Sequence, residues 1–406
     1  MQTTNPFARP VYMMAKTAGS LCNLRCKYCY YLEKAKLYDN NEKHVMSDQM
    51  LERFTKQYIE AQTSQDVMFT WHGGETLMRP ISFYKKALRF QQLYGKGRRI
   101  ANCIQTNATL LNDDWCKFFR DNNFLVGVSI DGPQEFHDAY RLSTDGRPTW
   151  NQVMRGIRLL NQYHVEWNAL AVVNNLNVEH PHEFYQFFKD IRCQFIQFTP
   201  IVERIVDNRN DGLTLAPGME EGGRMADFSI TPEQWGRFLC EIFDEWVRHD
   251  VGTYFIQTFD ATLANWVGVA PGICSLSKEC GHAGIMEYNG DVYSCDHFVY
   301  PEHMLGNLRH KTITEMMYSD KQRQFAKMKT EMLPKQCHEC DFLFACHGEC
   351  PKNRFVKDHY GNPGLNYLCK GYHMFFQHVK PYMDFMKGEL AAQRPPANVM
   401  NFVIEK

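Results

Sequence analysis

The sequence lacks the features that would place the protein in a membrane or on nucleic acid. It has no run of 18 apolar residues, so no segment is suited to cross a bilayer as a helix. The first residues, MQTTNPFARPVYMMAK, contain no apolar stretch of the signal-peptide kind. Lysine plus arginine (45) nearly balance aspartate plus glutamate (46), so no excess of positive charge attracts phosphates or anionic lipid. We therefore expect a cytoplasmic protein that binds neither membrane nor nucleic acid.

Cysteine is too sparse for a disulfide scaffold but frequent enough to indicate metal or redox chemistry. The 406 residues include 15 cysteines, well below the roughly 8–10% that marks short secreted disulfide-rich chains. In a reducing compartment thiols stay free unless a metal or redox chemistry uses them. The 16 histidines show no metal-binding spacing, and we assign them no role. The composition therefore favours metal bound by thiolates.

The cysteines fall into two groups separated by a cysteine-poor middle. The first group is Cys22, Cys26 and Cys29, and the second, in the last third of the chain, is Cys274, Cys280, Cys295, Cys337, Cys340, Cys346, Cys350 and Cys369. The other four cysteines are single, and we interpret them as small buried apolar residues: Cys103, Cys116, Cys193 and Cys240.

The middle of the chain alternates predicted strands and helices, which indicates an α/β fold. Six short apolar runs predict strands at Tyr12–Lys16, Val67–Trp71, Ile100–Gln105, Leu125–Ile130, Glu166–Val173 and Phe195–Thr199. Helical patterns lie between them near Asp48–Ala61, Ser82–Tyr94, Asp113–Asp121, Asn151–Tyr163 and Pro181–Ile191. Six such units predict an open or partial barrel with parallel strands, in which chemistry gathers at the carboxyl ends of the strands.

Unusual residues do follow the predicted strands. The first strand leads into the three-cysteine segment, and the next three end in WHGGE at 71–75, QTN at 105–107 and SIDG at 129–132. Any one of these endings alone is ordinary turn chemistry, because Gly, Asn and Asp tolerate unusual backbone angles. Together at one edge of a barrel they indicate a site.

The spacing of Cys22, Cys26 and Cys29 indicates an iron–sulfur cluster rather than zinc. Structural zinc usually takes four ligands, and no fourth cysteine or histidine is near, since the closest downstream histidine is His44. A cubane cluster accepts one thiolate at each iron, so three cysteines leave one iron open to a ligand.

At these residues the sequence resembles the radical S-adenosylmethionine (SAM) superfamily, whose signature is C-x3-C-x-aromatic-C after the first strand of a partial (β/α)6 barrel. The resemblance implies that the open iron chelates SAM, whose reductive cleavage gives methionine and a 5′-deoxyadenosyl radical. It assigns SAM contacts to Tyr28 at the adenine, to the GGE motif Gly73, Gly74 and Glu75 at the amino group, to Ser129 and Asp131 at the carboxylate and ribose, and to Arg155 as a carboxylate partner.

The C-terminal cysteines resemble the SPASM domain found on radical SAM enzymes that modify peptides. A zinc site at Cys337, Cys340, Cys346 and Cys350 is the simpler alternative, but it leaves four other cysteines unexplained. The resemblance implies two closed auxiliary [4Fe–4S] clusters, three clusters in all. One auxiliary cluster would be held by Cys274, Cys280, Cys295 and Cys350, and the other by Cys337, Cys340, Cys346 and Cys369.

The predicted domain order follows from these motifs. We expect a radical SAM partial barrel over residues 1–230, a small cysteine-rich SPASM domain over 231–385 and a tail over 386–406. The barrel ends in the polar, Gly-rich segment Glu203–Ile230, which is typical of a linker or flap. Thr231 begins a helix with a capping box, and an apolar stripe from Trp235 to Trp246 predicts packing against the core.

Overall the pattern is similar to that of the anaerobic sulfatase-maturating enzymes, through AKTAGSLCNLRCKYCYYLEK, WHGGETL, QTNATLL, VSIDGP and YSCDHFV. That family oxidises an active-site Cys or Ser of a sulfatase to Cα-formylglycine. The resemblance implies a base at Asp296 and a substrate contact at Tyr31, with Arg141 as a weaker candidate for peptide contact. It also implies an unfolded or nascent sulfatase with a C/S-x-P/A-x-R motif as partner, and an electron donor such as flavodoxin or ferredoxin.

Two other functions remain open on the sequence. The first is another SPASM peptide maturase, which would make a thioether crosslink or a peptide-derived cofactor; such enzymes often have an extra N-terminal recognition domain, for which we expect no room before Cys22. The second is a non-catalytic electron-transfer or zinc-stabilised scaffold protein. An open three-cysteine site combined with GGE argues against the scaffold.

Overall fold

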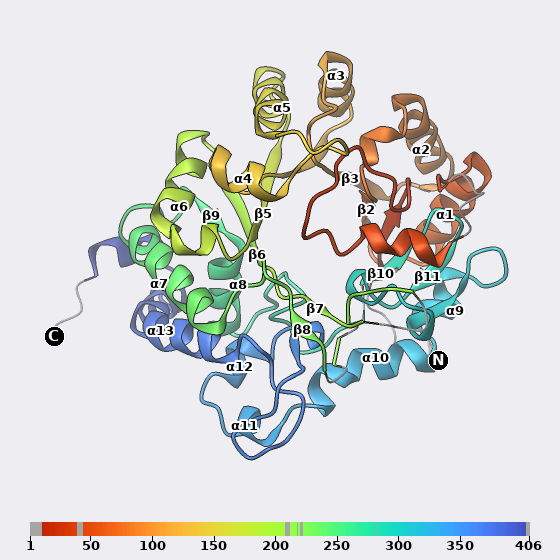
Figure 1. Cartoon of the computed structure of the whole chain (residues 1–406). Helices are drawn as coiled ribbons and strands as arrows, with labels where there is room; N and C mark the ends of the chain where they lie inside the picture. The colour runs from red at the N-terminus through yellow and green to blue at the C-terminus, as the bar shows by residue number, and fades with distance from the viewer. Residues whose placement is uncertain are drawn as a thin grey trace.

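The computed structural model describes residues 10–38, 44–207, 212–216, 218–219, 222–281 and 283–402. In this part of the chain six parallel strands stand side by side in sequence order, with helices on their outer face (Figure 1). The strands are β1 (Tyr12–Lys16), β2 (Asp66–His72), β3 (Arg99–Thr106), β4 (Phe124–Ser129), β5 (Trp167–Val173) and β6 (Phe195–Pro200). The six predicted strands are confirmed, each to within one or two residues at either end.

The connections between the strands are helical, as the periodicity predicts. They include α1 (Asp48–Glu60), α2 (Ile81–Tyr94), α3 (Asp113–Asp121), α4 (Gln134–Tyr140), α5 (Trp150–Gln162) and α6 (Pro181–Asp190). Each turns an apolar stripe inward, so that α1 buries Leu51 and Phe54 while its charged residues face out. The short helix α4 is the one connection that the sequence reading missed, because it follows the SIDG turn too closely for a separate apolar period to appear.

The sheet does not stop at the barrel. β10 (Ala283–Met286) pairs in parallel with β1, and β11 (Asp291–Tyr293) and β12 (Met304–Asn307) continue it as antiparallel strands. At the other edge the two-residue strand β9 (Phe255–Ile256) pairs with β6. The strand order is β12-β11-β10-β1-β2-β3-β4-β5-β6-β9. The division at residue 231 remains a prediction, because this sheet contains strands from both sides of it.

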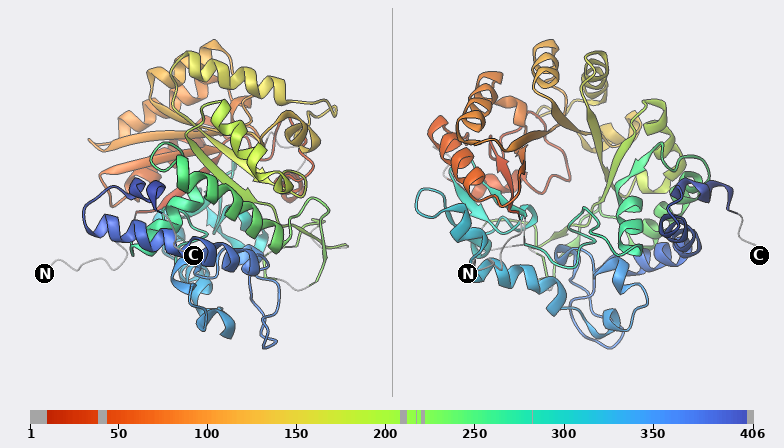
Figure 2. Two further views of the ribbon diagram at one scale, coloured as in Figure 1. Left: turned by 90° about the vertical axis from the view of Figure 1, so that its left-hand side faces the viewer. Right: turned by 180° about the vertical axis from the view of Figure 1, so that it is seen from behind.

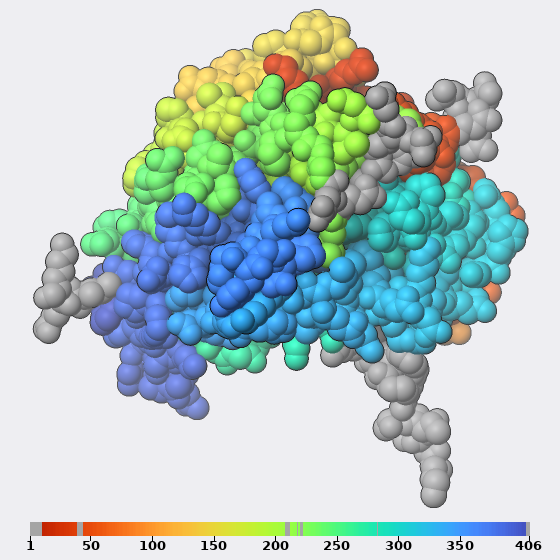
Figure 3. Space-filling model, turned by 60° about the horizontal axis from the view of Figure 1, so that its bottom comes forward, coloured from red at the N-terminus to blue at the C-terminus, as the bar shows by residue number. Residues whose placement is uncertain are grey.

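The C-terminal region closes the lower side of the barrel. Helix α7 (Pro232–His249) begins with the predicted capping box at Thr231, and its stripe is buried against α6 and α13 (Cys369–Ala391). Five shorter helices lie between α7 and α13 in the sequence: α8 (Gln257–Trp266), α9 (Ile313–Met317), α10 (Asp320–Glu331), α11 (Lys335–His338) and α12 (Leu343–Cys346). In the views of Figure 2 and on the face in Figure 3, cyan and blue segments cover this side.

None of the helices in the described part of the chain is both long and apolar enough to cross a membrane.

Candidate functional site at the barrel mouth

The three-cysteine segment forms an ordered loop directly after β1. Its backbone bonds to the end of α4 and the residues just after it: Arg25 N donates to Leu142 O at 2.7 Å and Lys27 N donates to Tyr140 O at 3.0 Å. A β-bridge joins Leu24 to Ser143. These bonds hold the cysteine loop across the mouth of the barrel, where the carboxyl ends of the parallel strands meet.

The thiols of Cys22, Cys26 and Cys29 line one central cavity of about 540 Å³. Burial raises the pKa of Cys22 and of Cys26 to about 12 and also raises that of Cys29. Buried thiolates without a cation are therefore strongly disfavoured here. Iron at three thiols would supply that positive charge, which fits the chemistry of the donor set.

The strand ends line the same cavity, as predicted. The lining comprises His72, Gly73 and Gly74 at the end of β2, Gln105, Thr106 and Asn107 at the end of β3, Ser129 at the end of β4, Leu170, Ala171 and Val172 of β5, and Gln197, Phe198, Thr199 and Pro200 of β6. Tyr28 and Tyr31 from the cysteine loop also line it. Of the residues predicted to contact SAM or substrate, the cavity lining thus includes Tyr28, Tyr31, Gly73, Gly74 and Ser129.

The GGE motif supports the cysteine loop through its backbone. Gly74 N donates to Gly19 O at 2.6 Å and Glu75 N donates to Leu21 O at 2.8 Å. A Cβ on Gly74 would lie 2.2 Å from Leu21 O, so only glycine permits this approach. Gly73 and Gly74 therefore line the pocket, while Gly74 and Glu75 support the loop.

Glu75 is buried and bonded within the protein rather than exposed to the cavity. Its carboxylate accepts hydrogen bonds from Leu77 N at 2.8 Å, Asn107 N at 2.7 Å and the Thr106 hydroxyl at 2.7 Å. Burial raises the pKa of Glu75, while these donors lower it. It organises the ends of β2 and β3, and its expected SAM contact stays a prediction.

Asp131 is likewise enclosed. It is fully buried and accepts from Arg141 Nη2 at 3.0 Å, Val172 N at 2.9 Å and the Tyr28 hydroxyl. Arg141 lines the cavity, whereas Asp131 is not among its lining residues. Arg155 also lies off the cavity lining, where its Nη2 donates to Thr109 O at 2.7 Å. Contacts of Asp131 and Arg155 with SAM therefore stay predictions, and Arg141 is the arginine that borders the cavity.

Asp296 belongs to a buried polar cluster at the carboxyl end of β1. Its Oδ1 lies 2.8 Å from Lys16 Nζ, and its Oδ2 accepts from the Tyr30 hydroxyl at 2.5 Å. Lys16 is fully buried, with Nζ 3.1 Å from His72 Nδ1 and 4.0 Å from the ring centre of Tyr31. Burial raises the pKa of Asp296, but the Lys16 ammonium together with His72 and His297 outweighs it and holds that pKa below its usual value. The carboxylate is therefore ionised and able to accept a proton.

Four residues at this cluster were missed by the sequence reading. Lys16, His72 and His297 line the cavity, and Glu287 accepts a hydrogen bond from the Tyr31 hydroxyl. Burial lowers the pKa of His72 and of His297 to about 4, and burial raises that of Glu287 to about 8. Lys16 and His72 end β1 and β2, but that position alone does not indicate that they meet Asp296. Glu287 had none, because its role depends on β10 pairing with β1.

The eight C-terminal cysteines form two spatial sets. Burial raises the pKa of the Cys350 thiol, and the nearby thiols of Cys274, Cys295 and Cys280 raise it further. Cys346 is influenced in the same way by Cys369 and Cys337, and Cys369 by Cys337 and Cys340. The structure thus brings together the two predicted sets of four. It also places Cys350 with the first set, which disagrees with the zinc alternative that grouped it with Cys337, Cys340 and Cys346.

The donor sets, of four thiols each, fit [4Fe–4S] clusters, in which each iron takes one thiolate. Buried cations hold the ligand loops: Lys329 Nζ donates to Cys274 O at 2.7 Å, and Arg354 donates to Lys329 O at 2.6 Å and Gly348 O at 2.8 Å.

The first of these sets reaches the central cavity. Cys274 and Cys350 line it together with Cys22, Cys26 and Cys29, while the second set is not among its lining residues. A three-thiol site and a four-thiol site therefore border one enclosed space.

The described part of Glu203–Ile230 contacts the C-terminal region through an ion pair between Glu203 and Lys352. Strands β7 (Arg204–Ile205) and β8 (Arg224–Met225) form a short hairpin. Glu203 lines the cavity and lies 2.5 Å from Lys352 Nζ. Residues 208–211, 217 and 220–221 of the predicted linker or flap lie outside the described residues.

Comparison with known proteins agrees with this geometry. Residues 18–188 match the family model of the radical SAM superfamily, and residues 278–341 match that of the SPASM iron–sulfur cluster-binding domain. The chain is 64% identical over 400 residues to a serine-type anaerobic sulfatase-maturating enzyme of Bacteroides thetaiotaomicron, covering 98% of this chain and 96% of the relative. It is 32% identical to a cysteine-type enzyme of Clostridium novyi, covering 90% and 94%.

A solved structure shows the same architecture. The chain is similar to native anSMEcpe with bound AdoMet and the Cp18Cys peptide, with a TM-score of 0.82, 29% identity and coverage of 94% of this chain and 100% of that one.

Proposed function

Because the chain belongs to the anaerobic sulfatase-maturating enzymes of the radical SAM superfamily, we propose that it oxidises a serine of a sulfatase polypeptide to Cα-formylglycine. The family performs this oxidation on Ser or Cys. Serine is favoured here because identity to the serine-type relative is 64%, against 32% for the cysteine-type relative.

The enzyme uses SAM and [4Fe–4S] clusters. We assign the SAM-binding cluster to Cys22, Cys26 and Cys29, and the auxiliary clusters to the two sets of four thiols. We assign direct SAM contacts to four cavity-lining residues: Tyr28, Gly73, Gly74 and Ser129. Three residues outside the lining, Glu75, Asp131 and Arg155, position the wall through their hydrogen bonds. Arg141, which borders the cavity beside Tyr28, pairs with Asp131 and so places positive charge at the cavity wall.

The residues at the end of β1 suit the removal of a proton from the target side chain. When bound, SAM and its cluster supply the radical that takes one hydrogen atom from the Cβ of the target residue. Asp296 accepts the hydroxyl proton, and Lys16 and Tyr30 keep its carboxylate ionised and oriented. Tyr31 lines the space for the target side chain, and its hydroxyl is held by Glu287.

The oxidation also releases one electron from the substrate. Cys274 and Cys350 border the same cavity as the three-thiol loop, so the first auxiliary site is close to where that electron arises. This shared cavity is the observation on which the proposed function depends. A non-catalytic scaffold needs no common space between an open and a closed site.

We further propose an unfolded or nascent sulfatase segment with a C/S-x-P/A-x-R motif as substrate, flavodoxin or ferredoxin as reductant, and the cytoplasm as location.

The test uses two peptides that differ only in Ser or Cys at the target position. Anaerobically reconstituted enzyme with SAM and dithionite should form 5′-deoxyadenosine and convert the Ser peptide to the aldehyde faster than the Cys peptide, measured by mass spectrometry. Faster conversion of the Cys peptide would contradict the serine assignment. SAM cleavage without aldehyde in either peptide would favour the thioether or cofactor-forming alternative.

A further inference from the structure

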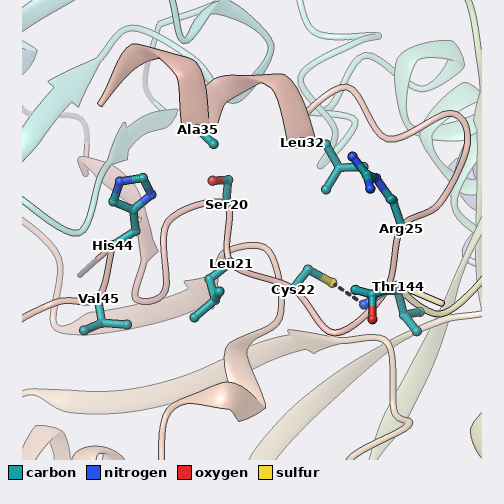
Figure 4. Close-up of a pocket in the computed structure, with 10 residues that line it drawn as sticks. Ser20, Leu21, Cys22, Arg25, Leu32, Ala35, His44, Val45 and Thr144 are labelled. Carbon is teal, nitrogen blue, oxygen red and sulfur yellow. Dashed lines mark hydrogen bonds between the residues drawn. The ribbon is translucent and has the colours of Figure 1, made fainter. Parts of the chain in front are cut away.

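A second pocket lies on the outer side of the cysteine loop and has no part in the mechanism above. Its volume is about 620 Å³. Figure 4 shows its walls, which come from the cysteine loop, the 3-10 helix η1 (Leu32–Leu37), the residues before α1 and the loop after α4. The lining residues are Ser20, Leu21, Cys22, Leu24, Arg25, Leu32, Ala35, His44, Val45 and Thr144.

The wall between this pocket and the central cavity is a single layer of residues. Ser20, Cys22, Leu24 and Leu32 line both spaces. Cys22 is one of the three thiols assigned to the SAM-binding cluster. The outer pocket is therefore a route by which a partner at the surface can approach that cluster without entering the cavity that holds SAM and the peptide.

The surface around the pocket combines one exposed apolar residue with positive charge. Leu21 is 43% exposed. Arg25 and Lys27 are exposed, and neither pairs with a carboxylate in the described part of the chain. None of the described residues that line the pocket is an Asp or Glu. An apolar centre edged by cations is suited to a partner with an acidic face.

The backbone of this surface is held in place. The amides of Arg25 and Lys27 donate to Leu142 O and Tyr140 O, at the end of α4 and just after it. Their Cα atoms therefore have fixed positions beside the outer pocket, and the backbone needs no ordering when a partner binds, which lowers the entropic cost of docking.

We propose that the outer face of the cysteine loop, formed by Leu21, Arg25, Lys27 and Thr144, is the docking surface for an acidic one-electron carrier protein. This inference rests on the proposed function, since SAM cleavage consumes one electron. In the docked complex the carrier is oxidised by one electron and the cluster held at Cys22 is reduced by one. The peptide needs access to Tyr31 inside the cavity, so the outer face is free for the carrier.

The test compares Arg25→Glu/Lys27→Glu with the control Lys85→Glu/Lys117→Glu. The control makes the same charge change at two exposed lysines on the outer helices α2 and α3. Two readouts are taken with an acidic flavodoxin: its dissociation constant by calorimetry, and the rate of electron transfer followed by reoxidation of the reduced flavin. SAM cleavage and peptide oxidation driven by dithionite are measured in parallel.

We expect the Arg25/Lys27 variant to bind flavodoxin and accept its electron at least about tenfold more weakly at low salt, with the difference shrinking at high salt. The control should stay within about twofold of wild type on both readouts. Dithionite-driven SAM cleavage, normalised to iron content, should fall much less than the flavodoxin-driven rate, because a small reductant needs no docking surface.

Equal flavodoxin binding and reduction rates in both variants and wild type would overturn the proposal. So would a raised KM for the peptide with dithionite, since that would assign the face to the substrate. Failure of wild type to oxidise any peptide with dithionite would instead overturn the proposed function, and the two failures are therefore distinguishable.

Discussion

The two thiol-rich regions of this enzyme differ in how many ligands they present and in what holds them. The cysteine loop after β1 offers Cys22, Cys26 and Cys29 to an open cavity, and backbone bonds to a neighbouring loop fix it. The C-terminal region gathers its cysteines into sets of four from helices and loops, and the buried Lys329 and Arg354 donate hydrogen bonds to backbone carbonyls of these segments. A site with three thiols leaves one iron free to bind a ligand, whereas a site with four thiols can only transfer electrons.

The charged side chains around the two regions also differ. The open site adjoins a titratable cluster of Lys16, Asp296, His72 and Glu287, which can take up or hold protons. The cations beside the closed sets are saturated by backbone carbonyls, so Arg354 donates to four of them.

The largest effect should follow from removing a thiol of the open site. Replacing Cys22, Cys26 or Cys29 with Ala should abolish formation of 5′-deoxyadenosine, because the iron that chelates SAM is no longer held. Cys240→Ala, at a thiol outside all three sets, is the matched control and should retain SAM cleavage. Loss of cleavage in the control as well would mean that the assay reports folding rather than the open site.

Asp296→Asn should separate the two half-reactions. The amide keeps the shape of the side chain but cannot accept the proton, so aldehyde formation should fall about 100-fold or more while SAM cleavage continues. Chromatography of 5′-deoxyadenosine and mass spectrometry of the peptide measure the two yields in one reaction. Unchanged aldehyde formation would remove Asp296 as the base.

Removing a thiol of the second closed set should lower the iron content more than it lowers SAM cleavage. Cys369→Ala should lower the iron content by up to about four per chain, out of about twelve, because the second auxiliary site loses a ligand. Aldehyde yield should fall further than the yield of 5′-deoxyadenosine. Iron analysis and electron paramagnetic resonance measure the loss. Full iron content in this variant would break the contrast between open and closed sites.

The smallest effect concerns the proton held at Glu287. Burial raises its pKa to about 8, so the folded protein favours the neutral acid. Its contribution to stability is present below the unfolded value near 4.5 and is lost as the pH rises through about 8. Glu287→Gln should therefore melt a few degrees higher than wild type at pH 8.5 and about the same at pH 4. The same difference at both pH values would show that Glu287 is not the titrating group.

Much of the barrel could be predicted because its signals are local. Each strand is a short apolar run bounded by turn residues, and each helix repeats its apolar residues at the helical period, as in α3, where both ends are those predicted. The positions of the cysteine loop and of the GGE motif after the strands follow from the chain order alone. The pairing of β10 with β1 could not be predicted, because it depends on a partner distant in the sequence, and α4 follows the SIDG turn too closely to show an apolar period of its own.

The candidate site divides in the same way. The cysteines, Tyr28, Gly74 and Asp296 are recognisable from spacing and resemblance. Lys16, His72, His297 and Glu287 become visible only when β10 brings the C-terminal hairpin beside β1. Asp131 and Glu75 show the opposite case, since their place in the motif indicated SAM while their hydrogen bonds are to the protein.

The sequence by itself determined the number of thiols in each group, the α/β pattern and the chemistry that an open three-cysteine site implies, because these depend on residue type and local spacing. Tertiary structure decided which thiols stand together, that Cys274 and Cys350 share a cavity with Cys22, and that a buried lysine faces Asp296. Such groupings depend on contacts between segments far apart in the chain, and only packing of the whole fold brings them within range of one another.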